Sequence, residues 1–113
     1  MDQLNIPRDG LITQVAVITI NSSREKVFAF ISDAASLPKM IRQYGPIHGV
    51  EKSVLHKGPW SAPGAYRTIY FDSGDTLREE LMAFDAPHYF AYNISAFTNF
   101  ARFLTKIAYG EWW

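Results

Sequence analysis

The sequence predicts an α+β fold in which a curved antiparallel sheet carries two short helices after its first strand. Three observations support this prediction. Strand-like runs flank a polar turn at residues 72–75, and a second turn signal at residues 85–88 precedes another run. A helix-start signal at residues 22–25 follows a stretch rich in valine and isoleucine. Glycine and proline in these turns suit the tight connections of an antiparallel meander.

Composition narrows the class of protein. Residues 1–113 are expected to form one domain, because 48% hydrophobic and 19% charged residues are ordinary for a globular chain. The formal net charge of zero makes nucleic acid an unsuitable partner. No cysteine is present, so disulfide and thiolate chemistry are excluded and a cytoplasmic location is expected. We expect neither a signal peptide nor stable membrane insertion, since no apolar run is long enough to span a bilayer.

The first strand is expected over residues 11–20, after an arm formed by residues 1–10. Valine, isoleucine and threonine dominate this stretch, and their branched side chains suit a pleated surface. The side chains expected to face inward are those of Ala16, Ile18 and Ile20.

Two short helices are expected next. Ser22 and Glu25 have the spacing of a capping box, in which each side chain satisfies a free backbone N–H group. Asp33 can cap a second helix over residues 34–41, which Pro38 limits to an irregular turn or two. The apolar stripe expected on the first helix consists of Val27, Phe30 and Ile31.

The central strands lie within residues 58–94, after a strand with a bulge over residues 47–57. A two-residue loop at Ser73 and Gly74 would pair Thr68 with Glu79 and Tyr66 with Leu81. The next turn would pair Leu81 with Tyr92 and Ala83 with Phe90. One face then collects Tyr66, Thr68, Tyr70, Leu77, Glu79, Leu81, Ala83, Phe90, Tyr92 and Ile94. The other face carries Arg67, Ile69, Phe71, Arg78, Glu80, Met82, Phe84 and Asn93.

The tyrosine-rich face has two interpretations. A simple core prefers aliphatic side chains, because a buried hydroxyl needs a hydrogen-bond partner. The face is either the wall of an amphipathic cavity or a core whose tyrosine tips reach its rim. After Ile94 we expect a loop with one helical turn, followed by a strand over residues 105–113 that ends in Trp112 and Trp113.

Few residues point to chemistry. The sequence holds no phosphate-binding glycine loop and no nucleophile elbow, and its three histidines lack a second ligand at metal spacing, so no metal or cofactor is expected. Glu79 is expected to point inward, where it would be neutral, hydrogen-bonded or next to a wet cavity; with another register it is solvated. Arg67 is expected to point outward and pair with Glu80. Trp60, in a loop rich in glycine and proline, either closes a cavity or fixes the loop to the core.

The order of elements resembles the START-like and birch-pollen-allergen-like helix-grip superfamily (SRPBCC), in its polyketide cyclase/dehydrase and lipid-transport branch. The resemblance covers about residues 12–113. It rests on residues 20–28, 33–40, 63–67, 77–85, 90–92 and 110–112. It implies a sheet that holds a long C-terminal helix over an apolar cavity, but no catalytic residues that can be transferred. The chain departs from the pattern at Met40, where tryptophan is common, and in lacking the last strand and the long helix.

Three functions follow as expectations. The first is binding or transport of a small hydrophobic ligand, lipid or polyketide-like, in an apolar cavity between the sheet and the helices. The second is a cyclase or dehydratase that uses Glu79 and tyrosine hydroxyls. The third is an interaction protein that forms a homodimer through its exposed sheet face. Catalytic residues stay unknown. The ligand-binding residues expected are Phe30, Trp60, Tyr66, Thr68, Tyr70, Glu79, Leu81, Phe90 and Tyr92.

Overall fold

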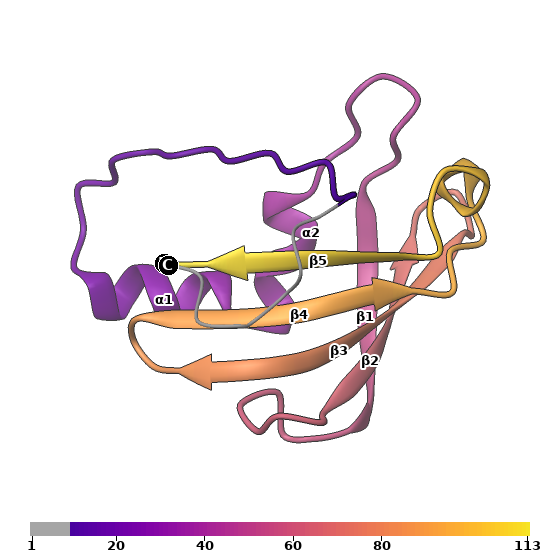
Figure 1. Ribbon diagram of the computed structural model, residues 1–113. Helices are drawn as coiled ribbons and strands as arrows, with labels where there is room; N and C mark the ends of the chain where they lie inside the picture. The colour runs from indigo at the N-terminus through magenta and orange to yellow at the C-terminus, as the bar shows by residue number, and fades with distance from the viewer. Residues whose placement is uncertain (1–9) are drawn as a thin grey trace.

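The computed structural model describes residues 10–113 and confirms an α+β fold built on an antiparallel sheet (Figure 1). The predicted arm over residues 1–10 lies outside the described residues except for Gly10. The helical elements are α1 (Arg24–Ile31), η1 (Ala34–Ser36), α2 (Leu37–Met40) and η2 (Phe100–Phe103). The strands are β1 (Val50–Lys57), β2 (Tyr66–Phe71), β3 (Thr76–Asp85), β4 (Tyr89–Ser95) and β5 (Ile107–Trp112). Their order in the sheet is β1-β2-β3-β4-β5, a simple meander.

Helix α1 turns only part of the predicted apolar stripe to the sheet, since Ile31 packs on the core and Phe30 does not. Its N-cap is Ser23, which accepts from the Lys26 N–H at 3.2 Å, rather than the Ser22–Glu25 capping box. Phe28 is buried, whereas Phe30 is 45% exposed. Phe28 meets two aromatic rings of the sheet edge to face, those of Phe84 and Phe90. This aromatic packing orients the helix and leaves Phe30 in solvent.

The second helical segment forms as predicted. The side chain of Asp33 accepts from the Ala35 N–H at 3.0 Å and so caps η1. Pro38 lies in the first turn of α2, where a missing N–H costs no hydrogen bond. Leu37 is buried against Val50 and Ile69, so α2 packs on the sheet at its β1–β2 side.

The β3–β4 hairpin has the predicted register only on the side of a bulge that lies away from the turn. Leu81 pairs with Tyr92 and Glu79 with Ile94, as expected. Beyond Leu81 the register shifts, so Ala83 pairs with Ala91 instead of Phe90. An extra residue in one strand reverses which side chains point inward. Phe84 therefore packs in the core, on the face predicted for Ala83.

The β2–β3 register was predicted wrongly by one residue. Arg67 pairs with Glu79 and Tyr66 with Glu80. The Phe71 N–H donates to the Asp75 carbonyl at 2.9 Å, which closes a loop of three residues instead of two, with Gly74 at φ +90°. A shift of one residue moves every side chain of a strand to the other face. Arg67 and Ile69 consequently point toward the helices. Tyr66 and Tyr70, which were predicted on the inner face, point away from them.

Residues 11–20 do not form the predicted strand. They carry no strand assignment and are exposed along their whole length, including Ile18 at 80% and Ile20 at 50%. Figure 1 shows this segment arching past the outer side of β5 before it enters α1. A strand needs a hydrogen-bonded neighbour, and this segment lies outside the ladder of β5. The inward orientation expected for its side chains is therefore wrong as well.

The core lies between the helices and one face of the sheet, here called the helix-facing face. One cluster of buried side chains joins Phe28, Ala65, Leu81 and Phe90, with Ile31, Trp60, Phe84 and Tyr92 packed against it. A second cluster joins Leu37, Val50 and Ile69, with Phe71 and Leu77 around it. Within residues 10–113, no helix is long and apolar enough to cross a membrane.

Candidate functional site

A buried ion pair lies on the helix-facing face between the two apolar clusters. Arg67 and Glu79 occupy directly opposite positions on β2 and β3. The Arg67 Nε–H donates to Glu79 Oε1 at 2.9 Å, and Nη2 of Arg67 is 2.8 Å from the same oxygen. Arg67 is 5% exposed and Glu79 is 7% exposed. The inward position predicted for Glu79 is confirmed, whereas the outward position and the Glu80 partner predicted for Arg67 are wrong.

The protonation of Glu79 reflects two opposing effects. Burial raises the pKa of the Glu79 carboxyl above its ordinary value, because the charged form loses its hydration. The charge of Arg67 and its hydrogen bond oppose this rise, with burial the larger effect. Tyr66 and Tyr70, which were predicted on the same face as Glu79, do not surround it, since they lie on the other face of the sheet.

Trp60 packs against the ion pair, and the resulting cluster has more buried N–H donors than acceptors. The Arg67 guanidinium carbon lies 3.9 Å from the centroid of the Trp60 ring, a stacked cation–π contact. Arg67 Nη1 and Trp60 Nε1 are both buried, and neither has a hydrogen-bond partner among the described residues. Of the two roles expected for Trp60, fixing its loop to the core agrees with its contacts to the Phe28 cluster.

Tyr92 borders the ion pair on β4. Its ring lies 6.4 Å from that of Trp60, and its hydroxyl accepts from Trp112 Nε1 at 3.4 Å. Burial raises the pKa of the Tyr92 hydroxyl, and the charge of Glu79 adds to the rise. The ring reaches across β5 at Gly110, where any Cβ would lie only 2.4 Å from the Tyr92 ring. The glycine therefore makes room for this tyrosine.

The structure divides the predicted ligand-binding residues into three groups. Five lie together on the helix-facing face: Trp60, Glu79, Leu81, Phe90 and Tyr92. Three lie on the outer face of β2: Tyr66, Thr68 and Tyr70. Phe30 lies on the exposed side of α1. Sequence reasoning missed Arg67 as a partner of Glu79, although a three-residue turn would have placed the two opposite each other.

The outer face has its own contacts, which separate it from the ion pair. The His56 ring and the Thr68 hydroxyl are hydrogen-bonded at 2.7 Å. The guanidinium carbon of Arg78 lies 4.2 Å from the centroid of the Tyr66 ring. These partly exposed pairs explain why β2 carries both aromatic and polar side chains on its outer face.

Among the described residues, two cavities lie away from the ion pair. One of about 630 Å³ is lined by residues 10–15 on one side and by residues of the η2–β5 segment on the other. Another of about 270 Å³ lies between Ile18, Ile20 and α1, with Trp112 and Trp113 in its wall. Neither includes Arg67 or Glu79 in its lining. The second cavity touches the buried cluster through Phe28 and Ile31.

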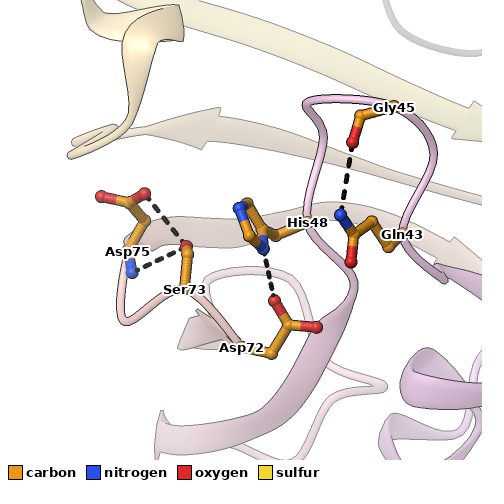
Figure 2. A network of polar contacts seen from close by, with 6 residues as sticks. All are labelled: Gln43, Gly45, His48, Asp72, Ser73 and Asp75. Atoms are coloured by element: carbon orange, nitrogen blue, oxygen red, sulfur yellow. Dashed lines mark hydrogen bonds and ion pairs between the residues drawn. The ribbon is translucent and has the colours of Figure 1, made fainter.

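A polar network at the β2–β3 turn has a structural role (Figure 2). His48 Nδ1 lies 2.7 Å from Asp72 Oδ1, and both side chains are half-exposed. Ser73 donates to the Asp75 carboxylate at 3.0 Å and accepts from the Asp75 N–H. These contacts fix the turn against the segment before β1. In the described part of the chain, no group of three or more His, Cys, Asp or Glu side chains could hold a metal ion.

Comparison with known proteins identifies the family. The model of the family described as polyketide cyclase / dehydrase and lipid transport matches residues 12–109. No curated protein and no solved structure matches the chain. The family match covers the helices and nearly the whole sheet, which agrees with the α+β architecture. The chain therefore belongs to the polyketide cyclase / dehydrase and lipid transport family.

Proposed function

We propose that the chain binds a small hydrophobic ligand, lipid or polyketide-like, against the helix-facing face of the sheet. The observation that carries this proposal is the pair of buried donors, Arg67 Nη1 and Trp60 Nε1, without an acceptor among the described residues. A buried donor without a partner costs about 1–3 kcal/mol. A ligand oxygen that accepts from these groups would recover that free energy, so the cluster favours a ligand with a carbonyl, carboxylate or hydroxyl group.

The surroundings of the donors are apolar, and the cavity of about 270 Å³ that touches the same cluster through Phe28 and Ile31 offers room for the apolar part of such a ligand. Leu81 and Phe90 are almost fully buried beside them, and Phe84 packs on the same cluster. Ligand sites are mostly apolar, with a few placed polar groups that fix orientation. Glu79 occupies Nε and Nη2 of Arg67, which leaves Nη1 for the ligand. The membership of the family supports a ligand of this class.

Calorimetric titration with oleic acid tests the proposal. Trp60→Phe removes one N–H donor and keeps an aromatic ring, so the affinity should fall several-fold, up to about tenfold. Trp112→Phe is the matched control, because the Trp112 N–H already donates to Tyr92. It should leave the affinity close to that of the unchanged protein. Absence of binding by the unchanged protein, or an equal loss in both variants, would contradict the proposal.

Catalysis of a cyclisation or dehydration is a second candidate, favoured by the raised pKa of Glu79. A carboxyl group with a raised pKa can exchange a proton nearer to neutral pH. The Tyr92 hydroxyl, whose pKa is also raised, keeps its proton and can donate it in a hydrogen bond. Incubation with a synthetic polyketone and mass spectrometry should show loss of water with the unchanged protein. Glu79→Gln should bind the substrate without product; an unaltered substrate mass in both cases excludes this candidate.

A further inference from the structure

The connection between β4 and β5, residues 96–106, exposes three large apolar side chains on one turn. Phe100 is 52% exposed, Phe103 is 76% exposed and Leu104 is 77% exposed. The segment contains η2 and projects from the end of the sheet opposite α1 (Figure 1). We call residues 96–106 the β4–β5 tip. Single exposed apolar side chains are ordinary, but apolar side chains grouped in one patch mark an interaction surface.

Hydrogen bonds hold the tip in this arrangement. Asn99 caps η2, because its side-chain oxygen accepts from the Ala101 N–H at 3.0 Å. Thr98 joins the tip to the start of β3: its hydroxyl accepts from the Thr76 N–H at 2.8 Å, and its own N–H donates to the Thr76 carbonyl at 3.0 Å. The apolar side chains are therefore presented by a capped and anchored turn.

The charged side chains of the tip itself are basic. Arg102 and Lys106 belong to it, and the sequence has no aspartate or glutamate from residue 86 to residue 110. The guanidinium carbon of Arg102 lies 4.6 Å from the centroid of the Phe103 ring, so a cation lies directly on an exposed aromatic side chain. An acidic side chain, Asp75, contacts the base of the tip, where it accepts from the Thr98 hydroxyl at 3.1 Å.

We propose that the β4–β5 tip docks the protein reversibly onto the surface of an anionic lipid bilayer. Aromatic and aliphatic side chains enter the boundary between headgroups and acyl chains, while nearby Lys and Arg attract anionic headgroups. Phe103 and Leu104 provide the apolar part, and Arg102 and Lys106 provide the charge. The turn is apolar at its end and carries cations beside it, so it matches a bilayer surface in which anionic headgroups lie next to acyl chains. The docking needs no spanning helix and does not depend on the ligand proposed above.

Co-sedimentation with vesicles tests the docking. Vesicles of phosphatidylcholine mixed with phosphatidylserine should bind the protein, and vesicles of phosphatidylcholine alone should bind it less. Phe103→Ser/Leu104→Ser should reduce the partition coefficient at least tenfold, because the apolar part is removed. Arg102→Gln/Lys106→Gln should abolish the preference for the anionic vesicles, with about a fivefold loss for each removed cation.

Val17→Ser is the matched control, since Val17 is 84% exposed in the segment of residues 11–20 and lines neither cavity. It should bind vesicles as the unchanged protein does. Circular dichroism should show that all variants are folded, as expected for substitutions of exposed side chains. Equal binding by Phe103→Ser/Leu104→Ser and the unchanged protein would overturn the proposal. So would absence of vesicle binding, including the case in which the tip proves to join two copies of the chain in solution.

Discussion

Strand β2 and the segment of residues 11–20 are both rich in residues that favour strands, yet only β2 is one. The six residues of β2 lie between β1 and β3 and exchange hydrogen bonds with both. Residues 11–20 have the same kind of side chains and no neighbour in the described sheet. The comparison shows that strand propensity expresses a fit to neighbouring strands and to a core, and not a property of the segment alone.

The exposure of isoleucine illustrates the difference between β2 and residues 11–20. Ile69 on β2 is 2% exposed, whereas Ile12 and Ile18 are 94% and 80% exposed. Full burial of one such side chain stabilises a protein by about 1.5–3 kcal/mol. The central strands therefore hold most of the stability of the fold, and residues 11–20 contribute little to it in this conformation. Substitutions in the two regions can test this difference in stability.

Arg67→Met should destabilise the protein by about 3–5 kcal/mol, because it leaves the Glu79 carboxyl buried without its cation. Urea unfolding monitored by circular dichroism measures the loss. The double variant Arg67→Met/Glu79→Met should recover most of it, since an apolar pair of similar volume often replaces a buried ion pair at little cost. A single variant as stable as the unchanged protein would show that the pair is not buried in solution.

Leu81→Ala should cost about 2–5 kcal/mol, since Leu81 is 1% exposed inside the Phe28 cluster. Val17→Ala, in the segment of residues 11–20, should change the free energy of unfolding by less than about 0.5 kcal/mol. Both values come from the same urea titration. Equal losses at the two positions would mean that residues 11–20 pack on the sheet in solution.

Glu79 should make stability depend on pH in a defined direction. Its pKa is raised in the folded protein, so the folded state binds its proton more tightly than the unfolded state. The stabilisation is complete below about pH 4.5, its ordinary pKa, and is lost as the pH rises through the raised folded value. Glu79→Gln should flatten this part of the profile of unfolding free energy against pH. A carboxyl NMR titration that places Glu79 at or below its ordinary pKa would contradict the prediction.

Self-association would change the comparison by covering residues 11–20 with a second chain. The homodimer expected from the sequence, through an exposed sheet face, stays a prediction, and the exposed Ile12 beside the outer side of β5 makes association over residues 11–20 testable as well. Sedimentation velocity should show a mass that rises with concentration above the 12.9 kDa of one chain. Ile12→Lys should weaken the association. A constant single-chain mass across micromolar concentrations would exclude a dimer in that range.

The elements that could be predicted from sequence are those fixed by local signals. Asp33 identifies the start of η1, and the β3–β4 pairing predicted for Glu79 and Leu81 forms, whereas the pairing predicted next to the turn before Tyr89 is wrong. The single helical turn before β5 was also predicted, and it forms as η2. Each of these depends on the chemistry of a cap or a turn within a few residues, which periodicity and residue type reveal.

The features that escaped prediction depend on contacts between distant residues. The choice of Phe28 over Phe30 for the core depends on the rings of Phe84 and Phe90, which lie far along the chain. The side of β2 that faces the helices depends on whether the turn before β3 contains two or three residues. Both lengths suit the sequence around Gly74, so the candidate site was predicted with Glu79 but without Arg67.

Strand β2 carries two complete side-chain patterns, and the length of one turn selects between them. Arg67 and Ile69 form one pattern, and Tyr66, Thr68 and Tyr70 form the other. Deletion of a single codon, that of Ser73, would shorten the turn and turn the strand over relative to β3. The face toward the helices would then exchange Arg67 and Ile69 for Tyr66, Thr68 and Tyr70, and Glu79 on β3 would lose its cation. In evolutionary terms, one change of loop length can give this sheet a different helix-facing surface, with every side chain of the strand retained.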